Sequence, residues 1–255
     1  MTRRRWIADK IQGDQAFLHG QNAEHLARVL RARAGQEFEV VAENRLYLGR
    51  IKQISEQEVV FELSHELEGI EAEAKSGVTL WLAVFKFDRM EWAIEKATEL
   101  GVDGIVPVIA QRSDAHLVAA AQKRAERWRR IAREASQQSR RSLPPEVLDP
   151  MKFKQALTSA KGARVVLSEY EKQRQLGAVL RELDPGEPIS LAVGPEGGWT
   201  EKELEVFSFA GWKAASLGPN ILRAETAAIA ALAVVGAVRG LKIVSSTSQD
   251  QHCNC

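Results

Sequence analysis

Two glycine-containing loops in the second half of the chain hold the residues best suited to chemistry. The first loop follows the apolar run 189–193 and reads Gly-Pro-Glu-Gly-Gly at positions 194–198. Thr200 and Glu203 have the spacing of a capping box, so a helix is expected to begin directly after this loop. Glycines let a ligand approach the backbone closely, and a helix N-terminus offers free N–H groups. The loop indicates a ligand site, although a tight turn without a ligand would use the same residues.

The second loop, 216–227, contains Gly218 and Pro219 and leads directly into an apolar helix. Arg223 and Glu225 lie where that helix should begin. Burying either charge without a partner would be costly, so the two residues either pair with each other or face a cleft. Neither loop contains a Gly-x-Gly-x-x-Gly fingerprint or a Gly-Lys-Ser/Thr phosphate loop, which disfavours a nucleotide-dependent oxidoreductase.

Metal and disulfide chemistry are not indicated by the sequence. The five histidines are scattered, with no pair four residues apart and no His-Glu-x-x-His run. Cys253 and Cys255 are separated by one residue and cannot cross-link a core. The chain has neither a signal-like apolar start nor an apolar run of about 20 residues. We therefore expect a soluble cytoplasmic protein without a bound metal and without a membrane partner.

The first part of the chain, up to about residue 67, shows the pattern of short strands. Apolar and polar residues roughly alternate in three segments: Glu37 to Glu43, Leu46 to Ile54 and Glu58 to Leu67. One amphipathic helix should interrupt them, with Asn22 as its N-cap and an apolar face formed by Leu26, Val29 and Leu30, before Gly35 ends it. This pattern predicts a small β-barrel-like module.

In the second part of the chain, expected strands alternate with expected helices. The strands are 78–85, 104–108, 164–168 and 189–193, and the helices are 88–100, 116–139, 172–183, one from 201, and 225–239. This alternation predicts the α/β class, with a parallel sheet covered by helices on both faces. The last helix is apolar on nearly every face, so it should be buried in the core or against a second subunit. The expected divisions are a barrel domain at 1–70, a linker at 71–77, an α/β domain at 78–242 and a disordered tail at 243–255.

Charge is distributed unevenly along the chain. The 35 Lys and Arg and 34 Asp and Glu give a formal net charge of only +1. Residues 120–145 nevertheless carry eight basic and two acidic side chains, a net charge of +6, whereas residues 55–75 carry −6. A basic helix is either a solvated face balanced by ion pairs or a surface that contacts phosphate. The near-neutral total therefore does not exclude a nucleic-acid partner.

Several motifs follow one another in an order that resembles a known family. They are His25 with Val29-Leu30-Arg31 and Gly35, then Lys86, Arg89, Glu91, Glu95 to Gly101, Pro107, Arg112-Ser113, Gln138-Ser139, Pro145, GPEGG and LGPNILRAETA. This order, over about residues 3–240, resembles the SPOUT methyltransferases, in particular the RsmE family, which methylates N3 of a uridine in 16S ribosomal RNA. Two positions depart from the family pattern: Arg140 stands where the family often has Gly, and Asn220 where it often has Arg.

The resemblance implies a fold and a set of partners. The fold would be a PUA-like RNA-binding barrel followed by a SPOUT domain with a deep trefoil knot, an exception to the rule against threaded chains. The partners would be ribosomal RNA or the small ribosomal subunit, and a second copy in a homodimer. The cofactor would be S-adenosylmethionine, held by loops of the knot at Leu167, Ser168, Glu169, Val193, Gly194, Pro195, Glu196, Gly197, Gly198, Leu217, Gly218, Ile221, Leu222, Arg223 and Thr226.

The same resemblance suggests catalytic and RNA-binding residues. The target base must be unstacked and held in line with the methyl group, and its N3 proton must be lost. Arg223 is the candidate for stabilising the developing charge, because a guanidinium keeps its own charge. Glu225 or Glu196 could accept the proton, although each could equally be structural. RNA contacts are expected from Arg3, Arg4, Arg5, Arg31, Lys86, Arg112, Ser113, Gln138, Ser139, Arg140 and Arg141.

Two rival functions stay open at this point. The chain could bind RNA without catalysis, with the glycine loops serving only as turns. It could also be a SPOUT enzyme that methylates another RNA position, a ribose 2′-hydroxyl or a guanine N1. The order of the family motifs favours N3 of uridine.

Overall fold

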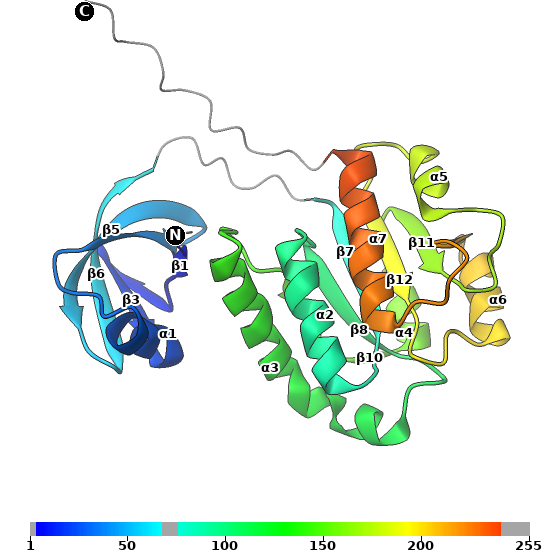
Figure 1. Cartoon of the computed structure of the whole chain (residues 1–255), viewed down its shortest axis with the longest axis horizontal. Coiled ribbons are helices and arrows are strands. Elements are labelled where there is room, and N and C mark those ends of the chain that lie inside the picture. The colour runs from blue at the N-terminus through cyan, green and yellow to red at the C-terminus, as the bar shows by residue number, and fades with distance from the viewer. Residues whose placement is uncertain (1–3, 68–75, 241–255) are drawn as a thin grey trace, which may run out of the picture.

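Two sheets, each with its own core, make up the computed structural model, which describes residues 4–67 and 76–240 (Figure 1). Four expectations concern residues outside these ranges in whole or in large part: the RNA contact at Arg3, most of the linker at 71–77, the tail at 243–255, and the Cys253 and Cys255 pair within it.

The first sheet has six strands and curls around a small core. They are β1 (Trp6–Ile7), β2 (Lys10–Gln12), β3 (Gln15–His19), β4 (Glu37–Ala42), β5 (Arg45–Ile54) and β6 (Glu58–Glu66), in the order β1-β4-β5-β6-β3-β2. All neighbours are antiparallel except β1 and β4. The three predicted strands are confirmed to within one residue at each end. Trp6, Leu18, Leu26 and Phe61 are buried between the strands and the helical segment.

The helical segment of this domain differs from the prediction. It consists of α1 (Gly20–Glu24), whose N-cap is His19 rather than Asn22, and a π-helical turn, η1 (His25–Val29). Wider π-helical winding rotates the later residues away from the expected face. Leu26 is buried, but Val29 and Leu30 are 65% and 49% exposed. The prediction of Asn22 as N-cap and of an apolar face through Val29 and Leu30 was therefore wrong.

The second sheet is parallel throughout. Its strands are β7 (Val78–Ala83), β8 (Gly104–Ile109), β9 (Glu146–Val147), β10 (Met151–Lys152), β11 (Ala163–Leu167), β12 (Ile189–Val193) and β13 (Lys213–Ala215). The order is β10-β8-β7-β12-β11-β13, with β9 also paired to β8. Strands such as β12 are buried along their whole length, as expected where helices cover both faces of a sheet.

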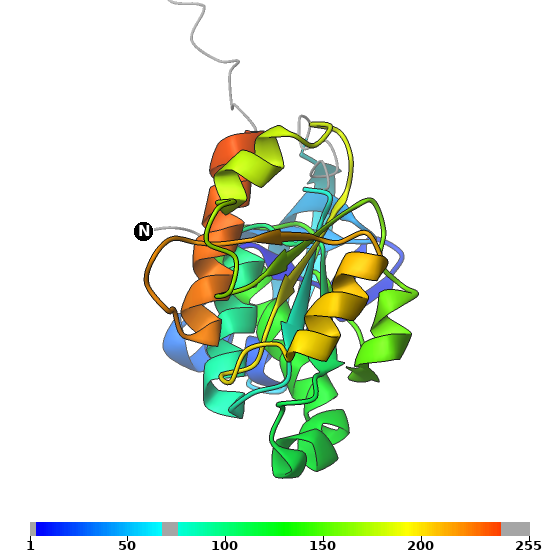
Figure 2. The ribbon, with the colours of Figure 1, turned by 90° about the vertical axis from the view of Figure 1, so that its right-hand side faces the viewer.

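Helices cover both faces of this sheet, as the sequence predicted (Figure 2). One face carries α2 (Phe87–Glu99), α3 (Ala115–Gln138), α5 (Leu176–Arg181) and α7 (Ala224–Arg239), and the other carries α4 (Phe153–Leu157) and α6 (Glu201–Phe209). Side chains of β7 alternate between the two layers, because successive strand residues point to opposite faces. Leu80 and Leu82 pack under α2 and α7, while Trp81 packs against Trp212, which in turn packs against Phe207.

One helix prediction needs correction, and another is decided only in part. The helix expected from Lys172 begins only at Leu176, because the carboxylate of Glu171 accepts hydrogen bonds from the backbone N–H groups of Gln173 and Arg174 and holds that stretch as a turn. Helix α7 has its predicted length, but only one of its faces is buried in the core. Apolar residues such as Ile229 and Ala233 on its other sides retain exposure.

Candidate active site

A pocket lies where β11, β12 and β13 end. Their carboxyl ends meet at one edge of the sheet, which is where parallel α/β sheets bind ligands. The pocket holds about 650 Å³ of empty space, part of it open to solvent. It is lined by three loops and the start of α7: Leu167, Ser168, Glu169, Val193, Gly194, Pro195, Glu196, Gly198, Trp199, Ala215, Ser216, Leu217, Gly218, Asn220, Ile221, Leu222, Ala224 and Ala227.

Two glycines of the loop after β12, Gly194 and Gly198, leave little room for a Cβ. Gly198 has a φ of +69°, and a Cβ there would lie 2.2 Å from Oε1 of Glu169. A Cβ on Gly194 would lie 3.2 Å from Nε1 of Trp199. At Gly198 the group that approaches the backbone closely is the carboxylate of Glu169, and this contact brings the loops after β11 and β12 together.

The helix that follows this loop is capped as predicted. The Thr200 hydroxyl accepts a hydrogen bond from the backbone N–H of Glu203, and the Glu203 carboxylate accepts one from the backbone N–H of Thr200. Glu203 is buried and also accepts a hydrogen bond from the backbone N–H of Gln111 at 2.8 Å. The capping box thus fixes the end of the loop and ties it to the segment after β8.

The loop after β13 lies against the segment before α5. The backbone N–H of Ser216 donates to the carbonyl of Arg174, and the N–H of Leu176 donates to the carbonyl of Ser216. The Ser216 hydroxyl closes the turn by accepting from the backbone N–H of Gly218. Backbone hydrogen bonds from Gln173 and Arg174 lower the pKa of Glu171, so its carboxylate stays charged and holds the neighbouring turn at neutral pH.

A guanidinium links two of the three predicted catalytic residues. Nη1 of Arg89, on α2, lies 3.4 Å from Oε1 of Glu196, and its Nε lies 3.8 Å from Oε1 of Glu225. Only 7% of the Glu225 side chain is exposed, and its Oε2 accepts no hydrogen bond from any described residue. Glu225 therefore points toward α2, outside the lining of the pocket. The alternative of an Arg223–Glu225 ion pair is wrong, because Arg89 takes that place.

Arg223 is the N-cap residue of α7 and is exposed. Its guanidinium makes no ion pair within residues 4–67 and 76–240. Its neighbours Leu222 and Ala224 both line the pocket, so its backbone lies at the rim. A charged side chain without an internal partner at this rim is free to meet a ligand.

Most of the residues predicted to bind the cofactor gather at this one pocket. Gly197, Arg223 and Thr226 do not line it: Gly197 and Thr226 are exposed beside it. The sequence reasoning missed Arg89 as a member of the charged cluster. It also missed six residues of the lining: Trp199, Ala215, Ser216, Asn220, Ala224 and Ala227. Arg89 was among the motif residues, but nothing in its neighbourhood along the chain connects it with Glu196 or Glu225.

The residues predicted to contact RNA fall into three groups. Lys86, Arg112 and Ser113 lie near the pocket: Lys86 is the exposed N-cap of α2, Arg112 donates to the carbonyl of Gly197 at 2.6 Å, and Ser113 donates to the carbonyl of Val84. Arg31 is exposed on the first domain with a φ of +51°. The remaining residues gather where the first domain meets the end of α3: Arg4, Arg5, Gln138, Ser139, Arg140 and Arg141.

Carboxylates surround much of the basic helix α3. Glu91 pairs with Arg124 and Arg127, Asp149 with Arg129, and Asp9 with Arg133. The sequence allowed two explanations of the basic charge on α3, a solvated face balanced by ion pairs or a phosphate contact. These ion pairs balance much of that charge.

Neither a metal site nor a membrane span is found in the residues that the structure describes. No group of three or more His, Cys, Asp or Glu side chains there could hold a metal ion. None of the helices between residues 4 and 240 that are described has the length and apolar character needed to cross a bilayer.

Comparison with protein families gives two matches along the chain. Residues 72–236 match the model of an RNA methyltransferase domain, and residues 18–64 match the model of an RNA methyltransferase PUA domain. The ribosomal RNA small subunit methyltransferase E of Bacillus subtilis is 31% identical over 223 residues, covering 85% of this chain and 87% of the relative. The protein of that name from Aquifex aeolicus is 29% identical and covers 90% of this chain and 97% of its own length.

Solved structures agree with these matches. A ribosomal RNA small subunit methyltransferase E from Neisseria gonorrhoeae, bound to S-adenosylmethionine, superposes with a TM-score of 0.79 at 29% identity, covering 92% of this chain and 98% of that one. A putative methyltransferase from Legionella pneumophila, also with bound S-adenosylmethionine, has a TM-score of 0.80 at 28% identity, covering 92% and 96%. The expected α/β fold with a preceding PUA-like domain is confirmed.

Proposed function

The chain belongs to the ribosomal RNA small subunit methyltransferase E family, and from that premise we propose that it methylates N3 of a uridine in 16S ribosomal RNA, using S-adenosylmethionine. The observation that carries the proposal is the single pocket at the strand ends, where the loops after β11, β12 and β13 converge. This pocket unites residues that are up to 60 positions apart in the sequence and that the family motifs marked in advance.

The pocket suits the proposed cofactor in its apolar walls and in its hydrogen-bond acceptor. Leu167, Val193 and Leu222 provide apolar walls for a flat aromatic group. Glu169 offers a carboxylate for hydroxyl or ammonium groups, and the absence of a Cβ at Gly198 keeps that carboxylate close to the loop backbone. Bound there, S-adenosylmethionine would supply a methyl group already activated by a sulfonium.

The residues of the chain then have to orient the base, hold its charge and remove its proton. We assign charge stabilisation to Arg223, because its guanidinium is exposed at the rim and has no partner in the described residues. Glu196 lines the pocket and is the better placed of the two acids to accept the N3 proton. Glu225 lies outside the lining, and we assign it the role of holding Arg89, which in turn contacts Glu196.

The remaining features of the proposal concern assembly and location. We propose a homodimer that covers the apolar residues of α7 that retain exposure, such as Ile229 and Ala233. We also propose a trefoil knot in the second domain, domain limits of 1–70 and 78–242, and a cytoplasmic location where ribosomes are assembled. The contact of Ser216 with Arg174 and Leu176 supports a chain crossing at that point.

Methyl transfer to purified RNA tests the function. Unmethylated small ribosomal subunits and free 16S RNA are each incubated with the protein and labelled S-adenosylmethionine, and the digested nucleosides are separated. We expect label in N3-methyluridine. Label in a 2′-O-methyl nucleoside or in N1-methylguanosine would instead show a SPOUT enzyme of other specificity. Failure to bind the cofactor in calorimetry would leave an RNA-binding protein without catalysis.

A further inference from the structure

The first domain is held against the end of α3 by its N-terminal segment. The backbone N–H of Arg5 donates to the carbonyl of Gln137 at 3.2 Å. From the other side, Nη2 of Arg133 donates to the carbonyls of Ile7 and Ala8 at 2.7 and 3.0 Å, and it lies 2.7 Å from Oδ1 of Asp9. The edge strand β1 is thereby fixed to α3 by one backbone hydrogen bond just before it and by the side chain of Arg133.

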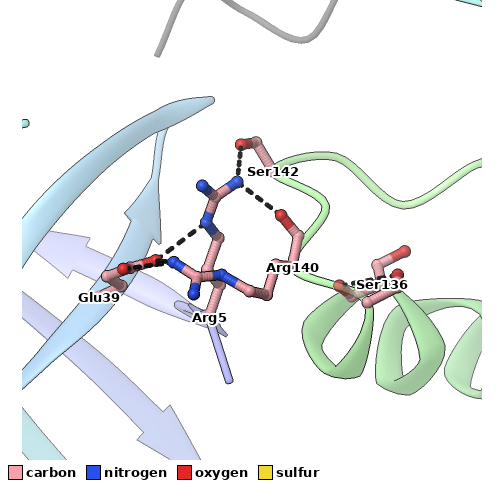
Figure 3. Close-up of polar contacts among 6 residues, drawn as sticks. Arg5, Glu39, Ser136, Arg140 and Ser142 are labelled. Carbon is pink, nitrogen blue, oxygen red and sulfur yellow. Dashed lines mark hydrogen bonds and ion pairs between the residues drawn. The ribbon is translucent and has the colours of Figure 1, made fainter. Parts of the chain in front are cut away.

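Glu39, on β4, joins the two domains through its side chain (Figure 3). Nη2 of Arg140 donates to both carboxylate oxygens of Glu39, at 2.6 and 2.8 Å, and Nε of Arg5 lies 3.0 Å from Oε2. Nη1 of Arg5 also donates to the carbonyl of Arg140 at 2.5 Å and to the hydroxyl of Ser142 at 3.3 Å. The three side chains are partly buried, with 13%, 22% and 39% of the Arg5, Glu39 and Arg140 side chains exposed.

The backbone at Arg140 adds a second observation. Arg140 has a φ of +64°, in the left-handed region that disfavours residues with a Cβ. A glycine would occupy this position just after α3 without strain. The arginine is held there with one guanidinium nitrogen, Nη2, within hydrogen-bond distance of both carboxylate oxygens of Glu39 in the other domain, a charge-assisted contact.

We propose that Glu39, Arg5 and Arg140 form an interdomain clamp, and that Arg5 and Arg140 are positioning residues rather than phosphate contacts. None of the three lines the pocket, and both guanidiniums already share one carboxylate. The clamp fixes the orientation of the first domain relative to the pocket. An RNA that contacts both therefore binds two surfaces whose separation is set before it arrives. This consequence for RNA rests on the proposed function, whereas the clamp itself does not.

Substitution of Arg140 by Gly tests the clamp without adding backbone strain. Asn44→Gly is the matched control, because Asn44 also has a positive φ, +63°, in an exposed turn of the first domain. Domain geometry is read by pulsed electron spin resonance in the full chain, with Cys253 and Cys255 replaced by Ser and spin labels at Gln53 and Lys154. Both label sites are exposed.

The clamp predicts a specific set of changes. Arg140→Gly and Glu39→Gln should each broaden the label-to-label distance distribution, and the double variant should broaden it by less than the sum of the two, since both remove the Arg140–Glu39 pair. Each should raise KM for RNA about tenfold, leaving kcat, cofactor affinity and the salt dependence of RNA binding unchanged. Asn44→Gly should match the parent chain in every readout.

Other outcomes would overturn the clamp. Unchanged distance distributions would show that the contact does not set domain geometry. A fall of about one in the slope of log K against log salt for Arg140→Gly would identify a phosphate contact instead. If the parent chain methylates no RNA, the proposed function fails, while the distance measurements still decide the clamp.

Discussion

The guanidinium of Arg89 lies 3.8 Å from the buried carboxylate of Glu225, although the two residues come from different helices, α2 and α7. The same guanidinium reaches Glu196 on the glycine loop. Arg89 thus connects the pocket loop to the start of α7, and it partly neutralises a carboxylate whose second oxygen accepts no hydrogen bond from the described residues. Such a charge is stable only while its partner remains.

Arg89→Ala should therefore destabilise the second domain by about 1–3 kcal/mol, because it leaves the Glu225 carboxylate buried and unpaired. Adding Glu225→Gln should recover part of that loss, since the buried charge is then gone. Urea unfolding of the single and double variants measures both effects. The matched control is Arg130→Ala, which breaks an exposed pair with Glu134 at the same 3.8 Å, and it should cost less than about 1 kcal/mol. If the loss of unfolding free energy in the double variant equalled the sum of the losses in Arg89→Ala and Glu225→Gln, this role of Arg89 would be contradicted.

Gly198→Ala should weaken cofactor binding. The methyl group would lie 2.2 Å from Oε1 of Glu169, so either the loop or that carboxylate must move out of the pocket wall. Gly211→Ala is the control, because Gly211 has a similar φ of +78° but no atom within 4 Å of a new Cβ. Calorimetry with S-adenosylmethionine should show normal affinity for the control. Equal affinity in Gly198→Ala would mean that the ligand does not depend on this loop.

Arg223→Ala should leave cofactor affinity nearly intact and lower turnover about 10²- to 10³-fold, the typical effect of removing a preorganised donor at a developing charge. Single-turnover methylation, started from the preformed complex with cofactor, isolates this step. The exposed Lys202 on α6 provides a charge-matched control, as Lys202→Ala should behave like the parent chain. Parental turnover in Arg223→Ala would remove Arg223 from the mechanism.

Lys86→Gln should weaken RNA binding and reduce the slope of log K against log salt by about 0.7 to 0.9, the change expected from one phosphate contact. Lys86 is exposed at the start of α2, one turn before Arg89, and its ammonium forms no ion pair with the described residues. Lys96→Gln, on the same helix, is the control and should leave the slope unchanged. Nζ of Lys96 already lies 2.8 Å from a carboxylate oxygen of Glu95 and of Glu99. A slope unchanged in Lys86→Gln would place the RNA elsewhere.

The first domain should lose stability in mild acid through His25. Burial, and secondarily the charge of Arg4, lower the pKa of His25 in the folded protein. The unfolded chain, with an ordinary histidine pKa near about 6.5, takes up the proton first. Stability therefore falls as the pH drops through about 6.5, and the loss is complete below the folded value. Thermal unfolding between pH 7.5 and 5 should show this loss, and His25→Gln should show less of it. If stability depended on pH identically in the parent chain and in His25→Gln, the assignment to His25 would be contradicted.

Local signals in the sequence were sufficient for much of the fold. The capping box of Thr200 and Glu203 needs only residues three positions apart, and the structure contains it as predicted. The strands β4, β5, β6 and β12 follow from alternation or from short apolar runs. The segment 20–29 could not be assigned in the same way, because α-helical and π-helical winding share one apolar pattern over so few residues.

The charged contacts depend on distant residues and could not be predicted. Arg89 and Glu225 are 136 positions apart, and Glu39 and Arg140 are 101 positions apart. A sequence shows that Arg140 is basic, but not that its guanidinium forms an ion pair with a carboxylate of the other domain. The pocket loops were foreseen because the family motifs mark them, whereas Asn220 and Ala227 carry no chemical signal of their own.

Mapping of methylated nucleotides in ribosomal RNA tests whether this protein methylates N3 of a uridine in 16S RNA. Small-subunit RNA is isolated from cells that lack the protein, from the same cells supplied with it, and from cells supplied with Arg223→Ala, and fragments are analysed by mass spectrometry. We expect one N3-methyluridine in 16S RNA that is missing without the protein, returns with it, and stays largely missing with Arg223→Ala. A 16S RNA with the same N3-methyluridine in all three samples would contradict it.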